Sequence, residues 1–228
     1  MSVSVLYYKV SPERISSAQQ SELINSWIEE LPLQKQQQIR KLRQQNDQVL
    51  SLAGLQLLKI GMSEFYSAPF SLKKIQFPEK SKPFFEGNID FNISHSGEIV
   101  CCVLSDSMEV GIDIEKQREV TPATMNKFLS GNDKSEITSK NTADNDMQKF
   151  FKLWTINEAI IKAANHGSIF NMSEITFNSE GGFYQDKFWF TCPININSDT
   201  SNKEYTCHIA CSEKITDSAI KIKQIINL

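Results

Sequence analysis

Residues 110–115 read Val-Gly-Ile-Asp-Ile-Glu, and residues 154–163 read Trp-Thr-Ile-Asn-Glu-Ala-Ile-Ile-Lys-Ala. Each segment places carboxylates inside an otherwise apolar pattern, where a charge is costly unless a cation or a strong donor meets it. Three carboxylates and a nearby lysine are what a magnesium-dependent phosphate site needs. The first candidates for chemistry are therefore Asp113, Glu115, Glu158 and Lys162.

The first segment predicts a strand. Residues two apart share one face of a strand, so Asp113 and Glu115 should point the same way, with Gly111 beside them. Two carboxylates on one face raise each other's pKa unless a cation lies between them. The alternative is an exposed edge that carries two solvated acids.

The second segment belongs to a helix predicted from about residue 147 to residue 165. Its apolar residues recur at helical spacing, and Glu158 interrupts that stripe one turn before Lys162. A Glu-Lys pair at this spacing is commonly an exposed pair of little energetic value. The position of Glu158 on the apolar stripe favours a buried functional acid, and both interpretations remain open from helical geometry alone.

Composition sets broad limits on the function. The chain has 228 residues, 40% of them hydrophobic, and a net charge of -3, which disfavours a protein that coats nucleic acid. No apolar run reaches the ~20 residues of a membrane span, and the N-terminus lacks the features of a signal peptide, so we expect a cytoplasmic protein. The five cysteines include no CxxC pair, which disfavours a disulfide framework or a zinc knuckle.

The order of predicted elements indicates an α+β fold. A loose repetition of helices followed by strands predicts an N-terminal α+β half at residues 1–107 and a C-terminal α+β half at residues 108–228 that carries the acidic motifs. Residues 99–105 and 110–115 read as strands joined by a short turn, so a hairpin is expected there.

Three further motifs offer cations or small polar groups. Lys82-Pro83 is a rigidly placed lysine or a surface turn, and Ser94-His95 lies in the turn-like run Asn-Ile-Ser-His-Ser-Gly at residues 92–97. The helical stretch that contains Arg40 and Lys41 reads as a solvated face, or as a surface for phosphate or partner binding.

The joint order of these motifs is more specific than any one of them. Lys-Pro, Asn-x-Ser-His-Ser, Gly-Ile-Asp-Ile-Glu-Lys and Trp-Thr-x-x-Glu-Ala-x-x-Lys-Ala follow one another along residues 82–163. This order resembles the 4'-phosphopantetheinyl transferases, in particular the longer monomeric type that serves peptide and polyketide synthetases. The resemblance covers roughly residues 75–180.

The resemblance implies a reaction and a fold. The family moves the 4'-phosphopantetheine group of coenzyme A onto a serine of an acyl or peptidyl carrier protein and releases adenosine 3',5'-bisphosphate. Its fold consists of two similar α+β halves related by a pseudo-twofold axis, with coenzyme A and the active site in the cleft between them. A monomer is therefore expected, with no nucleic-acid or membrane partner.

The resemblance also implies roles for individual residues. Asp113, Glu115 and Glu158 match the acids that hold magnesium on the pyrophosphate, and Glu158 or a metal-bound water is the candidate base for the carrier serine. Lys162 matches the phosphate-binding lysine of the helix motif. The expected nucleotide and phosphate contacts are Lys82, Pro83, Ser94, His95 and, by a looser alignment, Arg40 or Lys41.

One residue departs from the family pattern. The helix motif usually reads Lys-Glu, whereas this chain has Asn157 before Glu158, which removes a positive charge beside the expected metal site. Two other functions therefore stay open. The chain could be a relative that binds coenzyme A without transfer, or another magnesium-dependent phosphotransferase or hydrolase.

Overall fold

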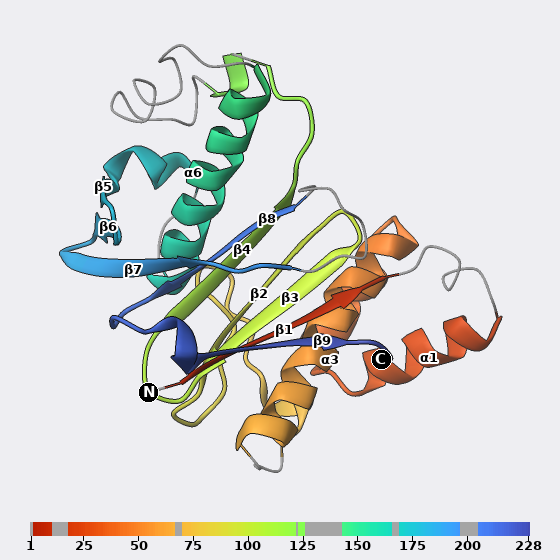
Figure 1. Cartoon of the computed structure of the whole chain (residues 1–228). Helices are drawn as coiled ribbons and strands as arrows, with labels where there is room; N and C mark the ends of the chain where they lie inside the picture. Colours follow the sequence, from red (N-terminus) through yellow and green to blue (C-terminus); the bar gives the residue numbers. More distant parts are fainter. Residues whose placement is uncertain are drawn as a thin grey trace. The chain divides into compact units, whose positions relative to one another are not determined.

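The computed structural model describes residues 2–10, 18–66, 70–121, 123–125, 143–165, 169–196 and 205–228. The chain forms two compact units, each with one sheet and one long helix (Figure 1). The first unit comprises Met1–Ser107 and Thr216–Leu228, and the second comprises Met108–Ile215. The last segment of the chain thus joins the first unit, whereas the sequence predicted it in the C-terminal half.

The first unit is built on a four-stranded sheet of order β2-β3-β1-β9. Neighbouring strands are antiparallel except β1 and β9, which are parallel. The elements in chain order are β1 (Val3–Lys9), α1 (Ala18–Glu29), α2 (Leu33–Arg40), α3 (Gln45–Tyr66), the 3-10 turn η2 (Leu72–Lys74), β2 (Asp90–Ser96), β3 (Ile99–Ser105), the 3-10 turn η4 (Asp217–Ala219) and β9 (Ile220–Ile225).

Helix α3 packs on β1, β2 and β3. Its apolar side chains and the alternating side chains of β1 and β3 form one buried core. The helix approaches the sheet closely at Gly61, where an added Cβ would lie 2.8 Å from a methyl group of Leu104. Strands β2 and β3 form a hairpin with a two-residue turn. In this turn Gly97 has a φ of 57°, a conformation that favours glycine.

The second unit has a five-stranded antiparallel sheet of order β4-β8-β7-β6-β5. Helix α6 packs mainly on β4 and β8. Residues 123–125 are also helical. The other elements are β4 (Val110–Lys116), α6 (Ala143–Ala163), the 3-10 turn η3 (Ile169–Glu174), β5 (Thr176–Asn178), β6 (Gly181–Tyr184), β7 (Lys187–Pro193) and β8 (Tyr205–Cys211).

The two units share one connectivity. In the first, β1 leads through α3 to the pair β2 and β3, and β3 returns beside β1. In the second, β4 leads through α6 to the pair β7 and β8, and β8 returns beside β4. The predicted α+β class with two similar halves is therefore confirmed.

The structure corrects several predicted elements. The hairpin expected between residues 99–105 and 110–115 is wrong, because β3 and β4 belong to different sheets and β3 pairs with β1 and β2 instead. Strands β6 and β7 are separated by a turn at Gln185 and Asp186, both at positive φ. Helix α6 begins at Ala143, earlier than the start predicted near residue 147.

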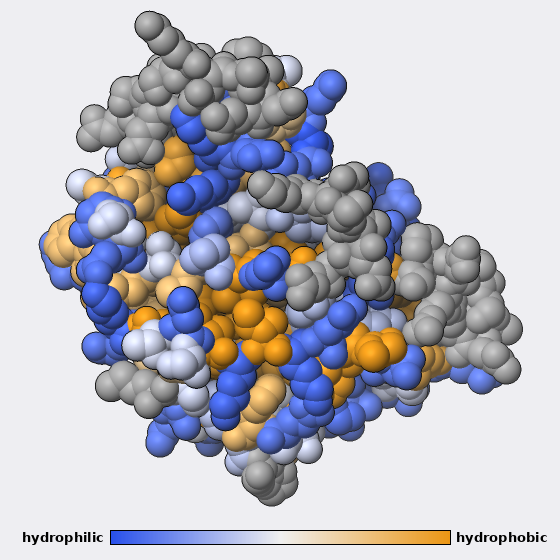
Figure 2. All heavy atoms as spheres, in the orientation of Figure 1, coloured by the Kyte–Doolittle hydropathy of each residue, from blue (hydrophilic) through white to orange (hydrophobic). Residues whose placement is uncertain are grey.

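Two expectations from composition can be compared with the described residues. All five cysteines are free thiols, and Cys101 and Cys102 are fully buried in β3. In the described part of the chain, no helix combines the length and apolar character needed to cross a membrane. Figure 2 shows hydrophobic and hydrophilic side chains interspersed on the face that it presents.

Candidate active site

Strand β4 has one apolar face and one face that carries the two acids. Val110, Ile112 and Ile114 are at most 1% exposed, and they alternate with Gly111, Asp113 and Glu115. Gly111 lies directly under α6, where an added Cβ would be 2.2 Å from the carbonyl oxygen of Ala159. The face that carries the two acids is therefore the face that α6 covers, which excludes the alternative of a freely solvated edge.

The close approach at Gly111 brings α6 within reach of the strand acids. Lys162 Nζ lies 2.5 Å from Asp113 Oδ1, and the side chains of this ion pair are 27% and 5% exposed, respectively. Lys162 therefore points toward β4, rather than forming the exposed helical pair with Glu158 that the i,i+4 spacing allowed.

Glu158 belongs to the same electrostatic cluster. Burial raises the pKa of its carboxyl group to about 6, against the attraction of Lys162, and the charges of Asp113 and Glu115 raise it further. Burial lowers the pKa of Lys162, but Asp113 and Glu158 outweigh it, so that the pKa is raised overall. The structure thus brings together the four residues that the sequence predicted, Asp113, Glu115, Glu158 and Lys162.

The donor chemistry of this cluster fits a hard divalent cation, since it contains three carboxyl groups and Mg²⁺ prefers carboxylate oxygens. The side chains do not form a finished coordination set. Within the described residues, no three His, Cys, Asp or Glu side chains are grouped so that they could hold a metal ion as they stand. Asp113 Oδ1 instead contacts the lysine ammonium group, and Glu115 Oε2 lies 3.7 Å from a guanidinium nitrogen of Arg118.

Asn157, the residue that departs from the family pattern, is 1% exposed. Its side-chain amide donates to the carbonyl oxygen of Leu153 at 2.8 Å, one turn earlier in α6. Its Oδ1 atom is buried, and no described residue donates a hydrogen bond to it. A side chain tied back to its own helix in this way cannot replace the reach of a lysine.

Two of the predicted phosphate-binding motifs, Lys82-Pro83 and Ser94-His95, lie in or next to β2. Lys82 Nζ contacts Asp90 Oδ2 at 2.5 Å, which anchors the Lys82-Pro83 loop to the first residue of β2. Ser94 is buried, whereas His95 is exposed on the opposite face of the same strand. The turn predicted around His95 is wrong, because β2 continues to Ser96 and only residues 97–98 form the turn.

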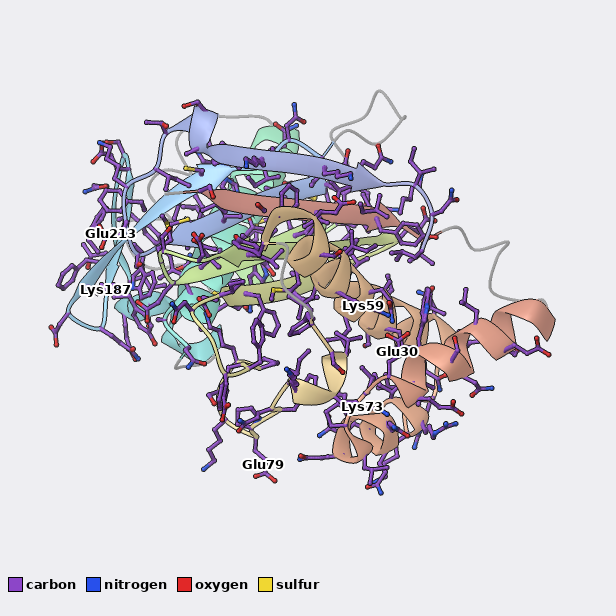
Figure 3. The ribbon with its side chains drawn as sticks, turned by 90° about the horizontal axis from the view of Figure 1, so that it is seen from below. Glu30, Lys59, Lys73, Glu79, Lys187 and Glu213 are labelled. Carbon is purple, nitrogen blue, oxygen red and sulfur yellow. The ribbon has the colours of Figure 1, made fainter. Side chains whose placement is uncertain are left out.

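Arg40 and Lys41 are exposed at the C-terminal end of α2, where Arg40 makes a long 3.5 Å hydrogen bond to Asn25 Oδ1. Lys35, one helical turn before Ile39, is half-buried with its ammonium group 4.9 Å from the ring centre of Phe77. A separate polar groove on this unit contains the Glu30–Lys59 ion pair at 2.7 Å and Lys73 (Figure 3). No predicted site residue lines that groove.

One buried polar pair near the acids was not predicted from the sequence. His208 on β8 is the cross-strand partner of Asp113, and its Nδ1 atom lies 2.7 Å from Thr155 Oγ1 on α6. The only signal in the sequence was a histidine within an apolar strand. The β4–β8 register, which places His208 opposite Asp113, cannot be obtained from the spacing of residues.

Comparisons with known proteins agree with this arrangement. A family model described as the 4'-phosphopantetheinyl transferase superfamily matches residues 109–210, which include β4, α6 and all of β8 except Cys211. A second, described as the N-terminal part of 4'-phosphopantetheinyl transferase, matches residues 17–107.

Individual relatives match over part of their length. The chain is 34% identical to 4'-phosphopantetheinyl transferase gsp of Aneurinibacillus migulanus, over 59% of this chain and 56% of that protein. It is 29% identical to a 4'-phosphopantetheinyl transferase of Bacillus subtilis, over 59% of this chain and 60% of that protein. The chain thus matches less than two thirds of the length of these two relatives.

A longer match is with 4'-phosphopantetheinyl transferase Sfp of Bacillus subtilis strain 168, at 30% identity over 70% of both chains. The two family models cover the strand acids, the helix motif and the segment around β2. The chain therefore belongs to the 4'-phosphopantetheinyl transferase superfamily.

Proposed function

We propose that this protein transfers 4'-phosphopantetheine from coenzyme A to a serine of an acyl or peptidyl carrier protein, in a magnesium-dependent reaction that releases adenosine 3',5'-bisphosphate. The observation that carries the proposal is the cluster of Asp113, Glu115, Glu158 and Lys162 between β4 and α6. Membership of the family supports the reaction class. We also propose that the reaction takes place in the cytoplasm and that the protein acts as a monomer.

Asp113, Glu115 and Glu158 would hold the magnesium ion, because carboxylate oxygens are its preferred protein ligands. When bound, the ion would neutralise charge on the diphosphate of coenzyme A. Lys162 is paired with Asp113 Oδ1 in the present arrangement, so it must shift if that oxygen is to become a ligand. An ammonium group released in this way would lie beside the same carboxylates and could bind a phosphate oxygen.

In the proposed reaction, the carrier serine oxygen forms a bond to the β-phosphorus of coenzyme A. The bond from that phosphorus to the oxygen that bridges the two phosphates breaks, and adenosine 3',5'-bisphosphate departs with the bonding electrons. Glu158 is the candidate base for the serine proton, because its carboxyl group belongs to the same cluster as Asp113, Glu115 and Lys162. Lys162 stabilises negative charge that develops on the departing phosphate.

We assign the nucleotide end of coenzyme A to residues of the first unit. Lys82 and Pro83 lie in the loop before β2, and Ser94 and His95 lie near the end of that strand. Arg40 and Lys41 offer exposed cations at the end of α2. Lys82 is the best anchored of the cations, through Asp90, and its side chain is only 10% exposed. An ordered cation of this kind loses little entropy when it binds a phosphate.

The direct test is incubation of the protein with coenzyme A, magnesium and a panel of apo acyl and peptidyl carrier proteins. One carrier in the panel should gain the mass of one phosphopantetheine, and the gain should disappear when its acceptor serine is replaced by alanine. Glu158→Gln provides a matched inactive enzyme. If no carrier gains mass while the enzyme is folded, the proposed transfer is wrong.

Asn157 favours a second candidate, a relative that binds coenzyme A without transferring its arm. The helix motif lacks the cation that the family pattern places at this position, because asparagine carries no charge. Its amide group is also tied to the carbonyl oxygen of Leu153. Calorimetry distinguishes the two candidates: tight coenzyme A binding without turnover on any carrier supports the binding protein, whereas turnover excludes it.

A further inference from the structure

His208 occupies a special place beside the acid cluster. It lies directly opposite Asp113 in the antiparallel β4–β8 register, so the two side chains share the face of the sheet that α6 covers. The imidazole is 5% exposed, and its Nδ1 atom lies 2.7 Å from Oγ1 of Thr155, which is fully buried. A buried imidazole with one defined partner on a neighbouring element is suited to hold that element in place.

The direction of this hydrogen bond follows from the other contacts of Thr155. Its hydroxyl group is 2.8 Å from the carbonyl oxygen of Phe151 and 3.1 Å from that of Lys152. A hydroxyl group has one proton, and in a helix it donates to a carbonyl of the preceding turn. Thr155 Oγ1 therefore accepts from His208 Nδ1–H. The imidazole is neutral, because burial, with a contribution from Lys152, lowers its pKa to about 4.

The Thr155–His208 bond fixes α6 near the residues that carry chemistry. Thr155 precedes Glu158 by three residues and Lys162 by seven, so all three lie on one side of the helix. The second fixed point is Gly111, where α6 and β4 approach so closely that an added Cβ would meet the backbone of Ala159 and Ala163. Gly111 sets the distance between helix and sheet, whereas a directional hydrogen bond also restricts sliding and rotation of the helix.

We propose that His208 and Thr155 are positioning residues that hold Glu158 and Lys162 of α6 in register with Asp113 and Glu115 of β4. This inference rests on the proposed function for its link to phosphopantetheine transfer. His208 itself takes no proton from the substrate in this account. It acts through the position of the helix, because its hydrogen bond to Thr155 restrains α6.

The test compares variants of the full chain. Thr155→Val keeps the shape of the side chain but removes the hydroxyl group, whereas Thr155→Ser keeps the hydroxyl group. Binding of Mn²⁺, followed by electron paramagnetic resonance, and steady-state transfer are measured for each. We expect Thr155→Val to weaken Mn²⁺ binding and to lower kcat roughly tenfold, without a matching rise in the KM for the carrier, and Thr155→Ser to stay within about twofold of the wild type.

Ile160→Ala is the matched control, because Ile160 is fully buried on the same helix within an apolar cluster. It should lower the stability of the fold but leave Mn²⁺ affinity unchanged. Wild-type affinity and kcat in Thr155→Val would overturn the positioning role, as would an equal loss of Mn²⁺ affinity in Ile160→Ala. If the wild-type protein binds Mn²⁺ but modifies no carrier, the proposed function fails, and the affinities still decide the positioning role.

A spectroscopic readout requires neither metal nor carrier. Long-range ¹H–¹⁵N spectra of the imidazole groups should show His208 neutral at pH 7 with its proton on Nδ1. This signal should change in Thr155→Val and persist in Thr155→Ser. A ring protonated on Nε2 and insensitive to Thr155→Val would overturn the inference even if activity were lost.

Discussion

Lys162 Nζ lies 2.5 Å from Asp113 Oδ1 and so joins the last turn of α6 to the middle of β4. The contact links two motifs separated by 49 residues in the chain. It also defines a conflict, because the same carboxylate is a proposed magnesium ligand and the lysine occupies one of its oxygens. Binding of a divalent cation and release of the lysine should therefore be coupled.

Loss of the lysine should leave Asp113 as a buried carboxylate deprived of its cation. We expect Lys162→Met to lower the free energy of unfolding by roughly 2–4 kcal/mol, somewhat less than for a fully buried pair because the lysine is partly exposed. Urea unfolding in buffer with a chelator measures this change.

Lys214→Met is the control for that variant. Lys214 pairs with Glu180, and both side chains are more than half exposed, at 65% and 51%. A surface pair of this kind contributes at most about 1 kcal/mol. Equal losses in the two variants would show that the Lys162–Asp113 pair has no special role in the stability of the unit.

Glu158→Gln should separate stability from activity. Burial raises the pKa of Glu158 from 4.5 to about 6, so the folded state binds more protons than the unfolded state between these pH values, and stability falls as pH rises through this window. The neutral glutamine avoids that penalty. Without divalent ions, the variant should match the wild type near pH 4 and exceed its stability by about 2 kcal/mol at pH 7.

The same variant should lose at least about 100-fold in kcat for transfer, because the candidate base and a metal ligand are both removed. Unfolding curves at several pH values, together with carrier assays in magnesium, provide the two measurements. A variant that is as active as the wild type would remove Glu158 from the site, whatever its stability.

Gly111→Ala should disrupt the approach of α6 to β4. The new methyl group would lie 2.2 Å from the carbonyl oxygen of Ala159 and 2.5 Å from the amide nitrogen of Ala163, and neither backbone atom can yield alone. We expect a loss of roughly 3 kcal/mol or more in unfolding free energy. Gly182→Ala is the control, because the three atoms nearest its methyl group belong to the side chains of Ile175, Ile160 and Phe177, which can shift more easily than backbone, so the change should be tolerated better.

Lys82→Met should act mainly on substrate binding. If Lys82 binds a phosphate of coenzyme A, the variant should raise the KM for coenzyme A about tenfold or more, with a smaller effect on kcat. The exposed Lys80 in the same loop gives the control variant Lys80→Met, for which an unchanged KM is expected. An unchanged KM in Lys82→Met would assign Lys82 to the fold alone, through its contact with Asp90.

The sequence predicted the acid cluster well because both motifs depend on local periodicity. Alternation along β4 placed Asp113 and Glu115 on one face, and helical spacing placed Glu158 and Lys162 on one side of α6. Long-range pairing could not be obtained in the same way. The expected hairpin at residues 99–115 assumed that neighbouring strands pair, whereas β4 pairs with β8, almost one hundred residues later.

The last strand and His208 show the same limit. Nothing in the local sequence of β9 indicates that this strand lies parallel to β1 in the first unit. His208 becomes meaningful only through its register with Asp113 and its contact with Thr155. Partner strands are chosen by burial over the whole fold, so a local pattern predicts the element but not its neighbour.

Asn157 allows a test of whether the chain gives up stability for function. Its Oδ1 atom is buried and receives no hydrogen bond from a described residue, a situation that costs about 1–3 kcal/mol. Asn157→Leu should therefore raise the free energy of unfolding, since it keeps the branching of the side chain at Cγ and removes the polar atoms. Asn157→Ala is the control for volume, because it removes the same atoms but leaves a cavity.

If Asn157 serves the reaction, Asn157→Leu should be more stable and yet transfer phosphopantetheine at least tenfold more slowly, in roughly the range that loss of one substrate hydrogen bond produces. Urea unfolding and the kcat for transfer to a carrier protein, measured on the same preparations, decide the matter. A leucine variant that gains stability and keeps full activity would show that the asparagine has no part in the reaction, and that loss of the family's lysine has left only a structural residue.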